Sequence, residues 1–499
     1  MNLNYCLPLL ILSSSFLPGV IIFFLHDDQV RLRTTLNLAG AGVQLLLIGR
    51  LIHGVFNDQI YEARLNLLPG MDLVFNADAL SVLFVTLSTG LWFVTTVYAI
   101  GYMEKAPNRS RFFGFFSLCV TATLGIAMAG NLLTFLICYE ILTLATYPLV
   151  THKRTPEAMR AGRIYLTYTL IGGMAFLIGT AWLRALAGPL DFTETGLLAA
   201  HMDISHLNLS IIFLLLIGGL GVKAALVPLH GWLPQAMVAP APVSALLHAV
   251  AVVKAGAFGI VRVVYDVYGI EHAEQLGLLA PLAAAAGVTI IYGSIRALYQ
   301  DELKKRLAYS TISQVSYIAL GAAIFGPMAS IGGIVHLVHQ GLMKITLFFC
   351  AGNLAETLGI HRISEMRGVG RRMPWTMAAF TLAALGMIGI PPIAGFVSKW
   401  YLGVGALESG ESWVLVVLAA STLLNAAYFL PIIYSTWFQQ PEAPWPHEHI
   451  PASRLETHWM LLLPPLLTAL LALGVGLLAN APFSPLVWTK FIVQQEYGL

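Results

Sequence analysis

The sequence has few charged residues: Asp, Glu, Lys and Arg make up 10% of its 499 residues, whereas 58% are apolar. A soluble globular chain is typically about 25% charged, so this composition excludes an ordinary water-soluble protein. The sequence also lacks a basic block of the kind that binds nucleic acid, and we expect no nucleic-acid partner. The chain is therefore expected to lie in a lipid bilayer.

Cysteine is scarce, with four isolated residues in apolar stretches: Cys6, Cys119, Cys138 and Cys350. No CxxC, haem-attachment or zinc spacing occurs, and no flavin, iron–sulfur or nucleotide signature. We therefore interpret the cysteines as small core residues and expect neither a cofactor nor a metal. The first apolar stretch lacks a preceding basic region, which favours a retained helix over a cleaved signal peptide.

Apolar runs recur along the chain, each of about 20 residues, which is enough to cross about 30 Å of hydrocarbon. Because a segment in lipid must satisfy its own backbone hydrogen bonds, these spans are predicted to be helices. The predicted fold is an all-α polytopic membrane protein with about fourteen transmembrane helices. The predicted spans are 4–25, 35–55, 78–101, 112–130, 132–151, 161–187, 209–229, 240–265, 277–298, 306–326, 328–351, 375–407, 412–438 and 458–480.

The loop charges predict an orientation. Most lysines and arginines fall in loops of one face, among them Arg31, Lys153 and Arg371. The opposite face has only Arg50, Arg64, Arg184, Arg262 and Lys490. The positive-inside rule assigns the first face to the cytoplasm, and both termini are then expected on the outer side.

Six ionisable residues interrupt the apolar segments: Glu140, Arg163, Lys223, Lys254, Lys344 and Lys399. A charge at bilayer depth costs at least about 2.5–3.5 kcal/mol, so such residues indicate an ion pathway. Burial disfavours the charged ammonium group and a nearby carboxylate favours it. Moving Glu140 towards Lys223, or away from it, would therefore load or unload a proton.

Each of these residues also has a structural interpretation. Glu140 and Lys223 could form a static pair that joins two helices, although such pairs seldom stabilise a protein more than apolar packing does. Lys254 could extend the relay towards Lys399 or reach an interface with its long side chain. Arg163 begins the sixth predicted span on the cytoplasmic side, where reaching the interface is as good an explanation as function.

Histidine titrates near neutrality and suits a proton relay, and three histidines lie within apolar helices: His248, His336 and His339. Haem ligation is an alternative, but His336 and His339 share one helix, whereas bis-histidine haem usually takes ligands from two. His230 lies in a short turn, LHGW, where a structural hydrogen bond explains it equally well.

Two further polar groups stand at span ends. Asp78 opens the third span and is predicted to cap it. Asp301, Lys304 and Arg306 begin the tenth span, where they are expected to anchor the interface, with proton entry as the alternative.

Proline interrupts two spans. The seventh ends in GVKAALVPLHGWLPQ, and the twelfth contains GMIGIPPIAGFVSKWY. Proline removes a backbone donor and breaks a helix, and broken helices at corresponding places in two halves indicate inverted repeats. We predict five-helix repeats at 106–270 (helices 4–8) and 271–440 (helices 9–13). Helices 1–3 at 1–105 precede them, and helix 14 with a tail at 441–499 follows.

Five motifs follow one another along the chain: PLHGWLPQA, APVSALLHA, DELKKRLAYSTISQVSY, HLVHQGLMKITLFFCAGN and GIPPIAGFVSKW. In this order they resemble the proton-translocating antiporter-like membrane subunits. That family includes subunits of respiratory complex I, of membrane-bound hydrogenases and of Mrp-type Na+/H+ antiporters. The resemblance covers most of the chain, about residues 70–440.

The resemblance implies roles for individual residues. It matches Glu140 to the family's fifth-helix acid and Lys223, Lys254 and Lys399 to the lysines of helices 7, 8 and 12. It also matches His248 and His336 to pathway histidines, and Lys344 to the lysine of the eleventh-helix motif. One departure concerns Gln340, which stands where many members carry a second histidine. His339 is one residue early, about 100° away around a helix, which argues against a pathway role.

Among family members, GVGRRMPWTM and the length most resemble the D-type component of Mrp antiporters. Lys399, where a middle-type complex I paralogue has glutamate, agrees with this. The chain ends soon after the predicted fourteenth span, so the long lateral helix of the largest complex I paralogue is not expected.

The resemblance thus implies a proton-translocating subunit of a multi-subunit Na+/H+ antiporter in the bacterial cell (inner) membrane. It would be a transporter subunit rather than a stand-alone enzyme, with other membrane subunits as partners. The alternatives are a proton-pumping subunit of NADH:quinone oxidoreductase or of a membrane-bound hydrogenase, and a subunit of a bicarbonate or CO2-uptake complex. A membrane scaffold without transport would not need the buried acid and lysines.

Overall fold

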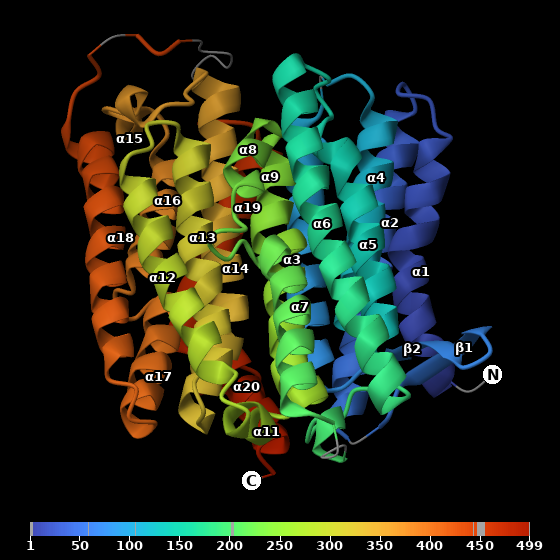
Figure 1. Cartoon of the computed structure of the whole chain (residues 1–499). Helices are drawn as coiled ribbons and strands as arrows, with labels where there is room; N and C mark the ends of the chain where they lie inside the picture. The colour runs from blue at the N-terminus through green and yellow to red at the C-terminus, as the bar shows by residue number, and fades with distance from the viewer. Residues whose placement is uncertain are drawn as a thin grey trace.

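The computed structural model describes residues 3–57, 59–104, 106–200, 204–442, 444–446 and 455–498. Lys105, the last residue of the first predicted unit, lies outside these residues. The described chain forms a bundle of roughly parallel helices, with one β-hairpin at the end where both labelled termini lie (Figure 1).

The first part of the bundle contains α1 (Leu3–Phe23), α2 (Val30–Val55), β1 (Glu62–Leu68), β2 (Met71–Asn76), α3 (Ala79–Tyr102), α4 (Arg109–Ala127), α5 (Leu132–Val150), α6 (Pro156–Ala187), η1 (Leu197–Ala200) and α7 (His206–Ala224). The middle part contains α8 (Trp232–Gln235), η2 (Ala236–Val238), α9 (Ala241–Ala249), α10 (Val252–Arg262), the π-helix η3 (Val263–Tyr268), α11 (Ile270–Gln275), α12 (Leu279–Leu298) and α13 (Leu303–Ala322). The last part contains α14 (Pro327–Leu358), η4 (Ile363–Glu365), α15 (Val369–Arg372), α16 (Pro374–Ile388), α17 (Ala394–Glu408), α18 (Trp413–Phe438), α19 (Trp459–Leu477) and α20 (Pro485–Glu496).

Within the described residues, 12 helical segments are long and apolar enough to cross a membrane. The prediction of an all-α polytopic membrane protein is confirmed, apart from the hairpin. The segment predicted as the tenth span is α13, which begins with the polar run LKKR. The segment predicted as the twelfth span is two helices of 15 residues each, α16 and α17.

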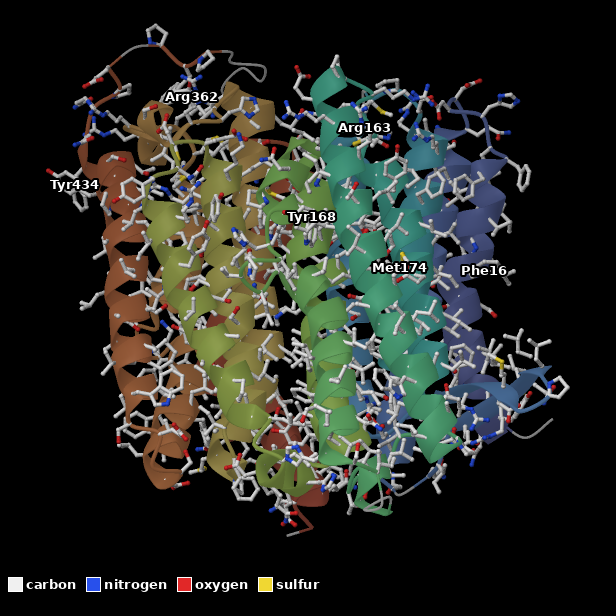
Figure 2. All side chains as sticks on the ribbon, viewed as in Figure 1. Phe16, Arg163, Tyr168, Met174, Arg362 and Tyr434 are labelled. Carbon is white, nitrogen blue, oxygen red and sulfur yellow. The ribbon has the colours of Figure 1, made fainter. Side chains whose placement is uncertain are left out.

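Burial separates an inner set of helices from an outer one. The apolar windows of α14 and of the segment Ala241–Tyr268 are completely buried. By contrast, Phe16, Met174 and Tyr434 are exposed on the sides of the bundle, where lipid would contact them (Figure 2). The core therefore follows α14 and the α9–α10 segment.

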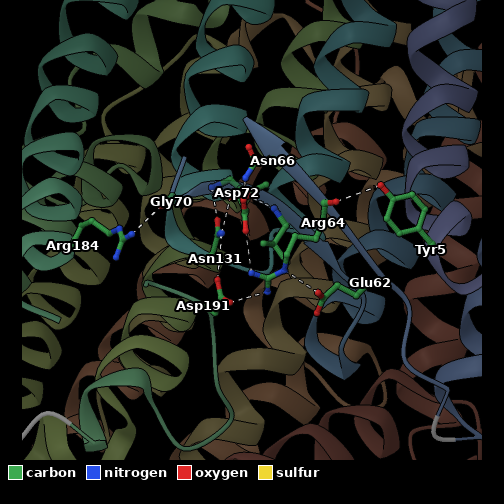
Figure 3. A network of polar contacts seen from close by, with 11 residues as sticks. Tyr5, Glu62, Arg64, Asn66, Gly70, Asp72, Asn131, Arg184 and Asp191 are labelled. Atoms are coloured by element: carbon green, nitrogen blue, oxygen red, sulfur yellow. Dashed lines mark hydrogen bonds and ion pairs between the residues drawn. The ribbon is translucent and has the colours of Figure 1, made fainter. Parts of the chain in front are cut away.

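The hairpin β1–β2 was not predicted from the sequence, which assigned no structure between the second and third spans. Its strands pair in antiparallel fashion, and Gly70 supplies a φ of +78° at the turn. Arg64 contacts three carboxylates, the closest being Asp191 at 2.8 Å, and Arg184 donates to the Gly70 carbonyl at 2.9 Å (Figure 3). A single exposed ion pair contributes little to the free energy of folding. Here several such contacts act together and hold the hairpin against the loop after α6.

The crossing of α13 and α14 depends on two glycines. A Cβ added to Gly321 would lie 2.5 Å from the Cα of Gly333, and one added to Gly333 would lie 2.9 Å from the Cα of Gly321. Small residues allow this close backbone approach, which is how helices pack in a membrane.

We predict that Gly321→Ala destabilises the protein, because the added methyl group meets backbone atoms that cannot rotate away. Overpacking of this kind costs about 1–3 kcal/mol. Gly218→Ala is the matched control: nothing lies within 4 Å of its added Cβ, and alanine is the better helix former. Thermal unfolding of the detergent-purified protein should show a lower midpoint for Gly321→Ala only. Equal midpoints for both variants would contradict this account of the crossing.

Candidate functional site

Four lysines line the interior of the bundle, and we call them the buried lysine series: Lys223, Lys254, Lys344 and Lys399. They come from α7, α10, α14 and α17 respectively. The first three have no exposed surface. Each ammonium group hydrogen bonds to a main-chain carbonyl or a hydroxyl group, and none of the four forms an ion pair with another described residue.

The break between α16 and α17 creates the site of Lys399. Pro391 and Pro392 have no N–H, so the carbonyls of Met387 and Ile388 lack the donors that a continuing helix would supply. Lys399 Nζ donates to these two carbonyls at 3.3 and 2.7 Å. It also donates to Thr422 Oγ1 of α18 at 3.1 Å. The proline pair therefore builds an oxygen-lined site for an ammonium group.

The end of α7 holds Lys223 in a comparable way. The helix stops at Ala224, where Ala225 takes a left-handed φ of +58° and Pro228 follows. Lys223 Nζ donates to the Tyr139 carbonyl of α5 and lies 3.2 Å from the centre of the Tyr139 ring. A cation over an aromatic face is stabilised by the ring quadrupole.

Glu140 is close to this lysine but is not paired with it. The structure contains no ion pair between Glu140 and Lys223, although the two groups remain within electrostatic range. Glu140 Oε1 is buried without a hydrogen-bond partner among the described residues. The carboxylate packs against α6 at Gly173, where an added Cβ would lie 2.2 Å from Oε1. The static-pair interpretation does not describe this arrangement.

Two of the histidines predicted to serve the pathway make contacts in the same interior. His336 Nδ1 lies 2.8 Å from Ser398 Oγ, and Ser398 directly precedes Lys399. His248 packs its ring against Phe348 at 4.5 Å between centroids. Lys254, six residues later, donates to the Leu337 carbonyl of α14 at 2.9 Å.

Lys344 extends the polar interior towards α18. Its Nζ donates to Ser310 Oγ at 2.8 Å, and the Tyr428 hydroxyl lies 2.9 Å from the same oxygen. Tyr428 in turn donates to Asn425. These contacts join α14, α13 and α18 by hydrogen bonds.

Several buried polar atoms near the series have no protein partner among the described residues. They include both ring nitrogens of His248 and His339, Nε2 of His336, the Tyr317 hydroxyl and the side-chain amides of Gln314 and Gln340. Buried polar groups in proteins are bonded to protein atoms or to internal water. We therefore expect this band to be hydrated, which is what a proton path between separated side chains requires.

Other predicted residues differ in their surroundings. Arg163 is exposed near one end of α6 (Figure 2), which favours the interfacial interpretation. Asp78 accepts a hydrogen bond from Ser81 N at 2.7 Å, so the predicted cap is confirmed. Lys304 donates to the Ala239 carbonyl at 2.5 Å, so its amine turns into the protein rather than into the interface. His230 packs against Tyr292.

The sequence interpretation missed the oxygen partners of the lysines and of His336: Ser310, Ser398, Thr422 and Tyr139. Two of them carried a signal, because Ser398 precedes Lys399 and Ser310 lies in the quoted motif AYSTISQ. Thr422 gave none, since a threonine in an apolar helix usually bonds to its own backbone.

Comparisons with known proteins agree with this architecture. Residues 129–425 match the model of the family described as "NADH:quinone oxidoreductase/Mrp antiporter, TM". Residues 70–113 match "NADH-Ubiquinone oxidoreductase (complex I), chain 5 N-terminus".

Individual relatives come from more than one kind of complex. The chain is 35% identical to the N subunit of the NADH-quinone oxidoreductase of Desulforudis audaxviator over 86% of this chain and 85% of that protein. It is 27% identical to the D-type component of the Na(+)/H(+) antiporter of Bacillus subtilis over 90% of each. A chain of the Mrp complex from Dietzia sp. DQ12-45-1b superimposes with a TM-score of 0.85 at 22% identity, covering 100% of this chain and 98% of that one. The chain belongs to the NADH:quinone oxidoreductase/Mrp antiporter family of transmembrane subunits.

Proposed function

We propose that this protein carries protons across the membrane as one subunit of a multi-subunit complex. The observation that carries the proposal is the buried lysine series, whose ammonium groups lie on carbonyl and hydroxyl oxygens without ion-pair partners among the described residues. A fixed structural charge would be expected to have a permanent counter-charge. A lysine held only by neutral oxygens can lose its proton without leaving a buried carboxylate unpaired.

In this proposal the protein has fourteen spans, counting α13 and the α16–α17 pair with the 12 apolar segments. The units 106–270 and 271–440 form inverted repeats after helices at 1–105 and before the segment 441–499. The supporting observation is that α7 and α16 each end a few residues before a proline, and that a lysine of the series lies at each of these breaks.

The relay begins at Glu140, which tunes Lys223 by approaching or leaving it. The proton then passes along Lys254 and His248 and reaches Lys399, with His336 and Lys344 as intermediate groups. Because the Glu140 carboxylate and Lys223 are near one another but unpaired, a rotation of side chains is enough to change their interaction.

The proposed energy source is the exchange of protons for Na+. In this proposal the subunit lies in a bacterial inner membrane, with both chain termini on the outer side. The supporting likeness is to the Na(+)/H(+) antiporter component of Bacillus subtilis, over 90% of each chain. The second candidate is a redox-driven quinone oxidoreductase, which the higher identity of 35% to the N subunit of such a complex favours. Both use the same relay and differ in their partner subunits.

We predict that Lys223→Ala and Glu140→Gln lower proton flux by about tenfold or more, as expected when a proton-transfer group is removed. The measurement is dissipation of a pH gradient in inverted vesicles that contain the whole complex at matched expression. Arg163→Ala is the matched control, because it removes a basic residue from an exposed position and should leave the flux unchanged. Wild-type flux in both relay variants would exclude the proposed function.

The same vesicles separate the two energy sources. If the complex is an antiporter, adding Na+ starts the proton flux, and the relay variants abolish the response. A wild-type complex that responds to an electron donor and quinone but not to Na+ would replace the antiporter with the redox candidate.

We also predict that Gly173→Ala lowers the proton flux. Its added methyl group would occupy the position of the Glu140 carboxylate, 2.2 Å from Oε1. The carboxylate must rotate away, so flux should fall severalfold, by a barrier increase of about 1 kcal/mol, while assembly stays normal. Gly218→Ala serves as the control. An unchanged rate would indicate that the Glu140 position is not critical.

A further inference from the structure

A second group of charged side chains lies at the end of the bundle that carries the hairpin, where α20 and α11 are seen in Figure 1. We call Asp78, Arg262, Asp266 and Glu496 the hairpin-end cluster. Arg262 is 1% exposed, and its Nη1 lies 2.7 Å from Asp78 Oδ2 and 3.1 Å from Asp266 Oδ1. Its Nη2 also donates to Ser81 Oγ at 2.8 Å. The Arg262 guanidinium therefore forms ion pairs with two carboxylates, those of Asp78 and Asp266.

The cluster has more carboxylates than cations. Asp266 is 4% exposed, yet its Oδ2 has no hydrogen-bond partner among the described residues. Glu496, at the end of α20, likewise has a buried Oε2 without a partner there. Burial and the nearby Asp266 carboxylate raise the pKa of Glu496 well above its ordinary value, while Arg262 acts in the opposite direction. Asp78 and Glu194 add to the negative charge around Glu496.

The residues next to Asp266 and Glu496 in the sequence contact α14 through their hydroxyl groups. Tyr265, next to Asp266, donates to Ser330 Oγ at 2.6 Å, and the Tyr497 hydroxyl, next to Glu496, lies 2.9 Å from the same atom. Ser330 belongs to the helix that also carries His336. Asp266 and Tyr265 lie in the π-helix η3, and such irregular turns occur frequently at functional sites.

We propose that Asp266 and Glu496 share one exchangeable proton and form the site where protons enter or leave the relay on the hairpin side. The inference rests on the proposed function. One proton on this pair leaves two ionised carboxylates, instead of three, beside the single Arg262 guanidinium, and so lowers the cost of burying them. Because Tyr497 and Glu496 close the cluster from α20, the C-terminal helix is part of the site.

The chemistry of the cluster favours a proton over a metal ion. The Arg262 guanidinium occupies the space between Asp78 and Asp266 that a cation would need. Within the described residues, no group of three or more His, Cys, Asp or Glu side chains is arranged to hold a metal.

Infrared spectroscopy of the purified complex tests the shared proton directly. In wild type, a carbonyl stretching band of a protonated carboxyl group should shift when H2O is exchanged for D2O. Glu496→Gln or Asp266→Asn should each remove that band, whereas Gln494→Glu, which changes an exposed neighbour on α20, should leave it in place. A band that persists in both acid variants would overturn the proposal.

Flux measurements in proteoliposomes test the role of the site in transport. The rate is followed while pH is varied on the hairpin side alone. Glu496→Gln should lower the rate on the order of tenfold and flatten its dependence on that pH, with assembly unchanged. If Lys223→Ala is inactive while Glu496→Gln and Asp266→Asn keep the wild-type pH profile, this inference fails and the proposed function stands. If Lys223→Ala is fully active, the proposed function fails, and the infrared result still decides whether the pair holds a proton.

Discussion

Ammonium groups in the interior of this bundle are held by oxygen atoms of the protein, and several features of the fold serve to supply those atoms. Lys399 uses carbonyls that Pro391 and Pro392 leave without donors. Lys223 and Lys254 use carbonyls of neighbouring helices, and Lys344 uses a hydroxyl. A cation in hydrocarbon is costly, and each lysine of the series has an oxygen acceptor from a helix break, from a neighbouring helix or from a side chain of α13.

This form of solvation suits a group that changes its charge. A carboxylate partner would fix the lysine in its protonated form, whereas neutral oxygens stabilise the ammonium group moderately and also accept hydrogen bonds from other donors. The unpartnered atoms of His248, His339, Gln314 and Gln340 lie in the same interior. A path of this kind would depend on water and on side-chain rotation, and not on a continuous chain of direct contacts.

The sequence predicted the parts of this arrangement that depend on residue type and on the chain's local pattern. Lysines and an acid inside apolar runs indicated the series, and the proline motifs indicated where helices break. The hairpin was missed because β1 contains Glu62 and Arg64 and most of its residues are exposed, so it has no buried strand pattern. The absence of an ion pair between Glu140 and Lys223 was not predictable from the sequence. It depends on how closely α5, α6 and α7 pack, and no single helix sequence determines that packing. The hairpin-end cluster joins residues 78 and 496, which only the fold brings together.

The unbroken inner helix α14 has a mechanical consequence. It has 32 residues, about 48 Å at 1.5 Å per residue, and it carries Ser330, His336, His339 and Lys344 in one rod without an internal proline. Its whole apolar window is enclosed by other helices, and close glycine contacts attach it to α13 and α17. These groups must therefore keep fixed heights relative to one another during turnover. In the proposed relay, α14 therefore holds these side chains at constant spacing, and the chain breaks after α7 and α16 are the places where continuous helix hydrogen bonding does not restrain bending.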